Sequence, residues 1–534
     1  MTRPSHPERL DSHPERLDSH PESSEGSSER LHSHPERSEG SLSSQGSSEI
    51  AQPKILTQIE DDARAEVAHA FVDIAADYFA ETRDRSTRSS TSHTPATLAE
   101  RFDEPIPQAG APISEIIERL RTQVMPDSNH LWHPRYVGHQ MAGPVPAAVW
   151  AESLTGALNQ SVAVWEMSPI GTVIEHRVIA WMNELVGFTP GAGGTMTSGG
   201  TEATFTALLA ARNAAIPDAW TNGVGADPPL ILCGEHTHYA ATRAGAELGL
   251  GMKSVIAVRS RNFKIDPDGL ALKMRALLSS GKRIMAVVAT AGSTATGSFD
   301  DLESISALCD EYGIWLHVDA AHGGSALLSQ KHRSRLRGIA SARSLAWDPH
   351  KLMLIPSPSS MVLVRDERDL DRAFSQRAPY LFHDPRGERV WDQGTRSFMC
   401  TRRADVLKLW VALQRYGVKG FAELHDYFCD LTRYMWEEIN ERKDFEALHQ
   451  PESNILCFRY LPSPANGQKF DDAAIDEINR ELRERYNRSG EGWTTATSLA
   501  GRRVLRVTIM NPRTTTADIR DTLDGLAAIG RSLA

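Results

Sequence analysis

Short apolar runs alternate with helix-length amphipathic segments through the middle of the chain. Six runs between about residue 190 and residue 364 have the length and composition of buried strands, and helix-length segments separate most of them. This alternation is typical of an α/β fold with a mainly parallel sheet. The predicted strands are 230–233, 254–258, 285–290, 314–318, 344–347 and 361–364.

The segments on either side of this region are predicted to be mostly helical, because their apolar residues recur at helical spacing. Ser168 and Pro169 are predicted to open one helix, with serine as the N-cap and proline at the first position. Beyond residue 400 a long helix leads to two strands that alternate with amphipathic helices. The predicted helices are 54–83, 113–125, 144–158, 404–436, 471–486 and 516–533, and the two strands are 455–460 and 504–509.

These patterns divide the chain into four parts: a disordered low-complexity tail (1–50), an N-terminal helical segment (54–130), a large domain (131–420) and a small C-terminal α+β domain (421–534). The tail repeats Ser-His-Pro-Glu-Arg-Leu-Asp twice in succession and has almost nothing that could form a core. Three interpretations remain for it: a solvated tail, a metal-binding histidine repeat, and a translated repeat upstream of the true start.

Composition excludes several classes of function. The net charge of −11 and the pI near 6.0 give no support to nucleic-acid binding. No run approaches the roughly 18 apolar residues of a membrane span, and the N-terminus lacks the apolar core of a signal peptide. The cysteines show no CxxC spacing, which favours a reducing cytoplasm and neither a disulfide framework nor a zinc site. They are Cys233, Cys309, Cys400, Cys429 and Cys457.

The strongest candidate for chemistry is Lys351, which lies between two apolar runs. A buried ammonium without a partner is costly, so such a lysine tends to lose its proton and becomes a nucleophile that forms Schiff bases. Asp319 stands at the carboxyl end of the predicted strand 314–318. Pyridoxal 5'-phosphate (PLP) needs this pair, a lysine for the imine and a carboxylate for the pyridine nitrogen. The alternative is a surface lysine and a carboxylate that caps a turn.

A glycine-rich turn at 191–204 precedes a predicted helix and indicates a phosphate site. The free N–H groups and positive dipole at a helix start favour an anion, and Gly200 and Thr201 are best placed. A dinucleotide-binding turn is the rival interpretation, although a clean GxGxxG and the later acidic residue are missing.

Two further loops follow predicted strands. An imidazole from His236 or His238 could stack on an aromatic ring, although turn or capping roles are the simpler alternative for both. No third ligand stands at motif spacing, so no metal site is predicted there. The small hydroxyl residues of 289–301 suit a loop that faces a ligand, or an ordinary turn that caps the helix beginning at Asp301.

Five ordered motifs together resemble the PLP-dependent decarboxylases of the glutamate, cysteine sulfinate, aspartate, diaminobutyrate and aromatic amino acid group. The resemblance runs from about residue 133 to the C-terminus. It implies the fold-type I PLP-dependent transferase fold, with a seven-stranded, mainly parallel sheet in the large PLP-binding domain. The motifs are SGGTEAT (198–204), EHTHYAATRAGAELGLG (235–251), ATAGSTATGSFDDL (289–302), HVDAAHGGSA (317–326) and WDPHK (347–351).

The resemblance also implies roles for individual residues. The expected catalytic residues are Lys351, Asp319 and His238, and the expected substrate-binding residues are Arg506, which would grip a carboxylate in a bidentate fork, and Gln140. His238 and Ala321 would flank the cofactor ring, Thr294 would lie near its hydroxyl, and His350 would lie near its phosphate. The expected cofactor-binding set is Gly200, Thr201, His238, Thr294, Asp319, Ala321, His350 and Lys351.

One departure from the family concerns a mobile loop whose tyrosine protonates the substrate carbanion. The corresponding residues, about 383–391, contain no tyrosine, although Tyr380 and His383 stand nearby. Slow protonation would allow abortive transamination or oxidative deamination to an aldehyde. The missing tyrosine therefore leaves two possible products, an amine or an aldehyde, but does not change the expected cofactor.

The segments 380–382 and 391–410 resemble the glutamate and cysteine sulfinate branch, which implies an acidic amino acid substrate: glutamate, aspartate or cysteine sulfinate. The alternatives are an aromatic or diaminobutyrate decarboxylase, a decarboxylating aldehyde synthase, and, from another class, a nucleotide-binding protein without catalysis. Because the family's sites form between two subunits, we expect a cytoplasmic homodimer with the active site at the interface.

Overall fold

The structure is a computed structural model that describes residues 52–374, 382, 391–463 and 470–533. Contacts divide the chain into two units, Met1–Asp61 and Asp62–Ala534. The predicted tail 1–50 lies outside the described residues. The single helix predicted over 54–83 is instead two helices, α1 (Ile55–Asp62) and α2 (Ala65–Glu81), because the backbone is extended at Arg64 (φ −70°, ψ 150°).

A seven-stranded sheet forms the centre of the larger unit, with strand order β1-β9-β8-β7-β6-β2-β3. The neighbours from β8 through β7, β6 and β2 to β3 run parallel, whereas β9 is antiparallel to both β1 and β8. This sheet confirms the predicted α/β class. The bounds are β1 Gly193–Thr197, β2 Leu230–Gly234, β3 Val255–Val258, β6 Ile284–Thr290, β7 Trp315–Asp319, β8 Ser344–Trp347 and β9 Ser360–Val364; a separate pair, β4 (Ser260–Arg261) and β5 (Lys264–Ile265), forms a small hairpin.

The sequence did not predict β1, because its first residues are glycines and the segment reads as a turn. A Cβ at Gly194 would lie 2.6 Å from the carbonyl oxygen of Val362 on β9 and 3.1 Å from the side chain of Ile179. The close approach of the neighbouring strand and helix therefore requires glycine here, although glycine is a poor strand former.

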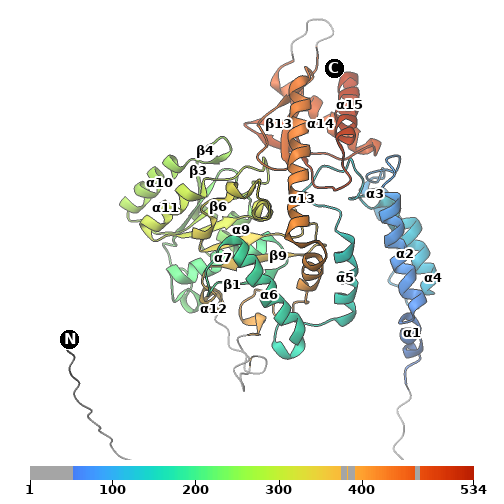
Figure 1. Ribbon diagram of the computed structural model, residues 1–534, viewed down its shortest axis with the longest axis horizontal. Helices are drawn as coiled ribbons and strands as arrows, with labels where there is room; N and C mark the ends of the chain where they lie inside the picture. Colours follow the sequence, from blue (N-terminus) through green and yellow to red (C-terminus); the bar gives the residue numbers. More distant parts are fainter. Residues whose placement is uncertain (1–51, 375–381, 383–390, 464–469, 534) are drawn as a thin grey trace, which may run out of the picture. The chain divides into compact units, whose positions relative to one another are not determined.

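Helices cover both faces of the sheet, and alternate strand residues supply the two cores (Figure 1). One core packs beneath α7 and α9, and the other beneath α6, α10 and α11. Two-faced burial explains why these strands are continuous apolar runs. The bounds are α6 Pro169–Val186, α7 Gly200–Ala215, α8 Ala219–Asn222, α9 Ala240–Glu247, α10 Pro267–Ser279, α11 Leu302–Tyr312 and α12 Arg368–Ala373.

The helix α6 begins at Pro169 with Ser168 at the N-cap position, as predicted, but the Ser168 side chain makes no capping hydrogen bond. Its hydroxyl donates to Oε1 of Gln160 at 3.1 Å and makes no hydrogen bond with the first turn of the helix. Asp301 does cap α11, accepting a hydrogen bond from the Ser304 N–H at 3.2 Å. No helix within the described ranges is long and apolar enough to cross a membrane.

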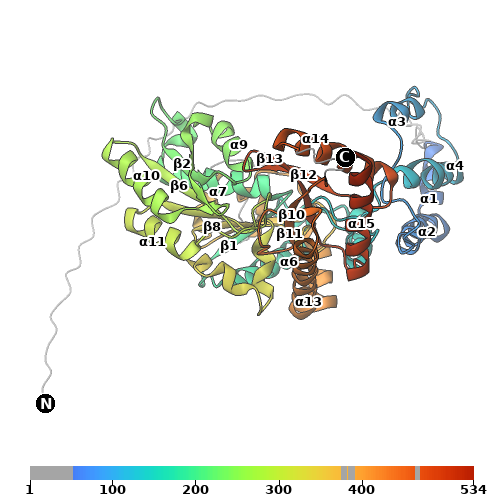
Figure 2. The same cartoon turned by 90° about the horizontal axis from the view of Figure 1, so that it is seen from above.

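The C-terminal part forms a second, antiparallel sheet with strand order β10-β11-β13-β12. Helices α14 and α15 pack on it around a separate apolar core (Figure 2). The long helix α13 reaches from α5 and α6 to this sheet, and its backbone is non-helical at Gly417 (φ 63°). The bounds are α13 Val406–Glu441, β10 Phe445–Ala447, β11 Ile455–Tyr460, α14 Asp472–Ser489, β12 Thr495–Leu499, β13 Arg502–Thr508 and α15 Thr516–Leu533.

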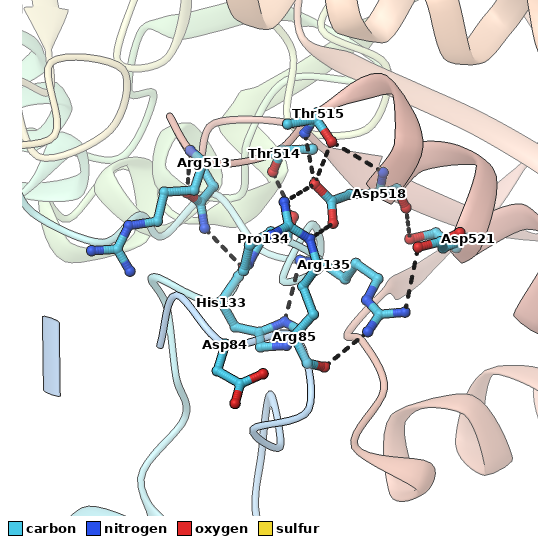
Figure 3. A network of polar contacts seen from close by, with 12 residues as sticks. Asp84, Arg85, His133, Pro134, Arg135, Arg513, Thr514, Thr515, Asp518 and Asp521 are labelled. Carbon is cyan, nitrogen blue, oxygen red and sulfur yellow. Dashed lines mark hydrogen bonds and ion pairs between the residues drawn. The ribbon is translucent and has the colours of Figure 1, made fainter. Parts of the chain in front are cut away.

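The segment that precedes the large sheet is tied to α15 by an ionic network (Figure 3). Arg85 donates to both carboxylate oxygens of the buried Asp518, at 2.6 and 2.9 Å. Arg135 in turn donates to the backbone carbonyl of Arg85 at 2.9 Å. These contacts join chain segments more than 400 residues apart. The remaining helices of this part are α3 Pro95–Arg101, α4 Ile113–Arg119 and α5 Pro146–Leu158.

Candidate active site

A cavity of about 270 Å³ opens at the carboxyl ends of β6, β7 and β8. Ligands bind at this edge in α/β proteins because loops from several strands meet there. All eight residues expected to bind the cofactor line the cavity, although five separate motifs supply them. The lining residues are Ser198, Gly199, Gly200, Thr201, His238, Thr290, Gly292, Thr294, Asp319, Ala321, His322, Asp348, His350, Lys351 and Ser357.

Lys351 reaches this cavity from the turn after β8, and it has a partner that the sequence analysis did not anticipate. Its Nζ lies 3.0 Å from Oδ2 of Asp348, a fully buried carboxylate. Burial alone would raise the pKa of Asp348, but the nearby Lys351 and His350 and a hydrogen bond from Ser360 hold it below its usual range. The ammonium is therefore paired, and the sequence-based expectation of an unpartnered buried lysine is wrong.

Asp319 ends β7 on the same side of the cavity. Its Oδ1 accepts a hydrogen bond from the Ala321 N–H at 3.2 Å. Burial raises the pKa of Asp319, although the positive charge of Lys351 opposes this shift. A buried carboxylate with a raised pKa indicates a position that a cationic ligand group would stabilise in its ionised form.

The first turn of α7 contributes Gly200 and Thr201 to the lining of the cavity. A Cβ at Gly200 would lie 3.0 Å from both Ala321 Cβ and Asp348 Oδ2, so a larger residue would press against the cavity wall. The sixteen-residue helix directs its unpaired N–H groups and positive dipole end at this point. This is the arrangement expected for an anion-binding site.

The imidazole of His238 lines the cavity from the segment between β2 and α9. Its Nδ1 accepts a hydrogen bond from the Ala240 N–H at 3.3 Å. Burial lowers the pKa of His238, with Asp319 acting in the opposite direction. A neutral ring held in this way can pack against a flat ligand.

The two predicted substrate-binding residues are not among the residues that line this cavity. Arg506, on β13, lies directly behind its wall: Nη1 donates to the carbonyl oxygen of Thr294 at 2.7 Å. Nε of Arg506 and Nε2 of Gln140 are buried and have no hydrogen-bond partner among the described residues. Tyr380 and His383, the candidates for the missing loop tyrosine, lie outside the described residues.

Comparison with known proteins identifies the family. The model of the pyridoxal-dependent decarboxylase conserved domain matches residues 95–461. The chain belongs to the pyridoxal-dependent decarboxylase family. It is 34% identical to the cysteine sulfinic acid decarboxylase of Rattus norvegicus over 449 residues, which cover 82% of this chain and 90% of the relative. It is 32% identical to the acidic amino acid decarboxylase GADL1 of Bos taurus over 448 residues, covering 82% and 85%.

A solved structure agrees with this assignment. The crystal structure of mouse CSAD in apo form superimposes with a TM-score of 0.83 at 30% identity, covering 89% of this chain and 100% of that one. The fold is therefore the fold-type I PLP-dependent transferase fold that the motifs implied. The chain is a PLP-dependent amino acid decarboxylase, a carboxy-lyase.

The residues around the cavity of this decarboxylase fit PLP. A lysine amine and a buried carboxylate face one cavity, a helix N-terminus supplies N–H donors for the phosphate, and a neutral imidazole is placed for ring packing. Gly292 adopts φ 85°, and a Cβ there would lie 2.7 Å from the Gly323 backbone nitrogen, so two wall loops meet closely.

Sequence reasoning missed several residues of the wall, chiefly Asp348, Thr290, His322 and Ser357. Asp348 stands inside the WDPHK motif, so its proximity to Lys351 three residues later was the available signal. The side chain of His322 is turned towards the C-terminal sheet, where its Nε2 lies 2.8 Å from Asn454 Oδ1. That long-range contact leaves no trace in the local sequence.

Proposed function

We propose that this enzyme decarboxylates an acidic L-amino acid, such as glutamate, aspartate or cysteine sulfinate, to the corresponding amine and CO2. The observation that carries this proposal is the match over 82% of the chain to relatives that are named as decarboxylases of cysteine sulfinic acid and of acidic amino acids. A buried guanidinium next to the cavity supports it, because arginine is always charged and binds carboxylates in a bidentate fork.

PLP, when bound, supplies the electron sink that stabilises the negative charge left on the substrate as CO2 departs. We assign Lys351 to covalent attachment of the cofactor and Asp319 to the ring nitrogen. Gly200 and Thr201 would hold the phosphate, with His350 close by. His238 and Ala321 would pack on the two faces of the ring, and Thr294 would lie near its hydroxyl.

Arg506 and Gln140 are assigned to the substrate. Among the described residues Arg506 donates one side-chain hydrogen bond, to Thr294, and its buried Nε has no partner there, so it retains donor capacity for a carboxylate. Burial lowers the pKa of Arg506, which shows that the guanidinium pays a desolvation cost that an anionic ligand would offset. Gln140 likewise keeps a buried, unpartnered amide nitrogen.

We further propose a cytoplasmic homodimer whose active sites form at the subunit interface. The free state of all five cysteines supports the reducing compartment. Large apolar side chains left exposed on neighbouring helices support the dimer. They are Trp150, Leu154 and Leu158 on α5 and Ile170 and Val173 on α6.

The test is product analysis with the PLP-loaded enzyme. Glutamate, aspartate, cysteine sulfinate, diaminobutyrate, tyrosine and tryptophan are supplied separately, CO2 is followed, and the products are identified by mass. We expect an amine and CO2 from at least one acidic substrate. Arg506→Lys should lower kcat/KM for that substrate by about a hundredfold, since a bidentate charged contact is lost. Arg503→Lys, an exposed arginine on the same strand, is the matched control.

Other outcomes would contradict the proposal in different ways. Activity confined to tyrosine, tryptophan or diaminobutyrate would overturn the acidic preference. Ammonia and an aldehyde, with oxygen consumption, would show that the altered loop redirects the reaction. Unchanged kinetics in Arg506→Lys would remove the assigned role of Arg506.

A further inference from the structure

A second group of reactive side chains lies outside the cofactor cavity. His332, His425 and Cys429 are all buried, and one potential ligand atom from each lies within 4.8 Å of the others. His332 precedes the 3-10 turn Arg333–Leu336, whereas the other two residues belong to the second half of α13. The group therefore joins two parts of the chain about 90 residues apart in sequence.

Spacing on α13 places two of these side chains on one face. His425 and Cys429 are four residues apart, which is one helical turn, and His425 Nε2 lies 3.7 Å from Cys429 Sγ. The ring of His332 lies against that of His425, with centroids 5.3 Å apart. Two residues at i and i+4 on one helix, here a histidine and a cysteine, can present two ligands to the same metal ion.

The carboxylate of Asp426 lies next to His332 at the solvent-facing side of the group. Oδ1 of Asp426 lies 3.7 Å from Nε2 of His332, and the side chain of Asp426 is 34% exposed. The nearby cations are already paired: Lys331 with Asp430, and Arg335 with Glu452 at 3.8 Å. An added positive ion would therefore meet little uncompensated positive charge.

One nitrogen atom that faces this group has no hydrogen bond. Nε2 of His332 is buried and lacks a hydrogen-bond partner among the described residues. Leaving a buried polar atom without a partner costs about 1–3 kcal/mol. Such atoms in a native structure call for an explanation, and an ion is one of the recognised ones.

We propose that His332, His425 and Cys429 bind a zinc-class transition metal ion, with the Asp426 carboxylate beside His332 as a nearby negative charge. Two imidazoles and a thiolate are ligands that such ions prefer. A thiolate and a carboxylate also neutralise a divalent charge. In a tetrahedral zinc site the ligand atoms lie roughly 3.3–3.8 Å apart, so small side-chain rotations suffice to close the present spacing.

Metal binding at this site requires the Cys429 thiol to lose its proton. The Cys429 S–H bond breaks, its proton goes to solvent, and the sulfur electron pair forms the bond to the metal; no oxidant or reductant is needed.

The position of the site indicates what a bound ion would do. The turn carrying His332 follows the segment Gly323–Leu328, which continues from Asp319 and Ala321 of the cofactor cavity. That segment also packs against α13. An ion would thus fasten the back wall of the active site to the long helix, so we expect it to raise thermal stability.

The test uses the PLP-loaded full chain, stripped with a chelator and dialysed against Zn²⁺ alone. The bound metal is counted per chain by elemental mass spectrometry, and its ligands are read from X-ray absorption at the zinc edge. The tail 1–50 contains several histidines and no cysteine, so a sulfur ligand distinguishes the proposed site from zinc on the tail. We expect one sulfur-ligated zinc per chain, about one proton released per ion, and a higher melting temperature.

Cys429→Ser should abolish the sulfur signal and the metal-dependent rise in melting temperature, and His332→Ala should weaken zinc binding at least tenfold. Cys309 is a buried cysteine of α11 outside the group. Cys309→Ser should therefore keep the sulfur signal and the metal-dependent rise in melting temperature of the parent chain. Zinc without a sulfur ligand in the parent chain, or an unchanged sulfur signal in Cys429→Ser, would overturn the proposal. PLP content and decarboxylation are measured separately and do not decide it.

Discussion

Two acidic side chains, Asp319 and Asp348, share the cavity with a single lysine, and their surroundings separate their properties. Asp319 is half-buried and has its pKa raised by desolvation, whereas Asp348 has its pKa lowered by Lys351 and His350. Titratable groups whose environments shift their pKa values in opposite directions are typical of catalytic centres. From this difference we infer that Asp348 holds the Lys351 side chain in position through their ion pair. Asp319 then remains available to pair with a cationic group of a ligand.

The sharpest test at this scale is Lys351→Ala. Removing the amine removes the atom that would bond to the cofactor, so borohydride reduction should leave cofactor mass on the parent chain and none on the variant. Decarboxylation should fall by roughly a thousandfold or more.

Lys282→Ala serves as the control, because Lys282 is exposed and pairs with Asp227 far along the chain from the WDPHK motif. Cofactor mass retained on Lys351→Ala, or full turnover by it, would refute the assignment of Lys351.

Several residues that line the cavity could be predicted from the sequence, because Lys351, Asp319 and Gly200 stand in short motifs with a clear chemical meaning. The contacts between distant segments could not be predicted. The hydrogen bond from Arg506 to Thr294 and the approach of His332 to Cys429 depend on tertiary packing, which no local pattern encodes. The absence of CxxC spacing argued against a metal site only within a single stretch of chain.

At the scale of elements, the network around Asp518 joins the segment before the large sheet to the start of α15 (Figure 3). Asp518 is almost fully buried, and its carboxylate also accepts hydrogen bonds from the N–H and hydroxyl of Thr515. Burial would raise its pKa, but the hydrogen bonds from Arg85 and Thr515 outweigh that effect and lower it.

We predict that Arg85→Ala lowers the free energy of unfolding by about 1–3 kcal/mol at pH 7, the usual contribution of hydrogen bonds to a charged group. A lowered carboxylate pKa gives stability that is present above the unfolded-state pKa, near 4, and is lost as pH falls through the folded-state pKa. The difference between parent and variant, measured by urea unfolding, should therefore shrink below about pH 4.

Arg520→Ala is the control, because Arg520 is exposed on the same helix and makes no hydrogen bond to Asp518. A difference between parent and Arg85→Ala that stays constant down to pH 2–3 would show that the ion pair is not its source.

Elements with strong periodicity were predicted well, and those shaped by neighbours were not. The strand at 344–347 and the helix at 516–533 appear at their predicted bounds because burial on the sheet and an apolar stripe dictate them. The strand β1 was missed because its glycines are required by the approach of β9. The helix predicted over 404–436 is interrupted at Gly417 by a positive φ that helical periodicity does not reveal.

At the scale of the whole molecule, the proposed homodimer would cover the exposed apolar side chains of α5 and α6. Leu154 is 55% exposed and Ile170 is 60% exposed, values that are costly for large aliphatic side chains without a partner. Closed two-fold dimers are the commonest assembly for such surfaces.

We predict that Leu154→Glu shifts the protein from dimer to monomer in sedimentation experiments and lowers kcat at least tenfold, since a charge would be buried at the interface. Leu272→Glu is a matched control, because Leu272 is 64% exposed on α10, away from this surface. A parent chain that sediments as a fully active monomer would refute the dimer.

The contact between β13 and the cavity wall has a consequence for how the enzyme is made. Thr294 is supported from behind by Arg506, a residue synthesised 212 positions later, and Ala295 accepts a hydrogen bond from Cys457. A ribosome therefore synthesises Lys351 and the strands of the large sheet before Cys457 and Arg506 exist. We expect a nascent chain that has exposed its large sheet to lack this support for Thr294 and Ala295 until β13 has been synthesised.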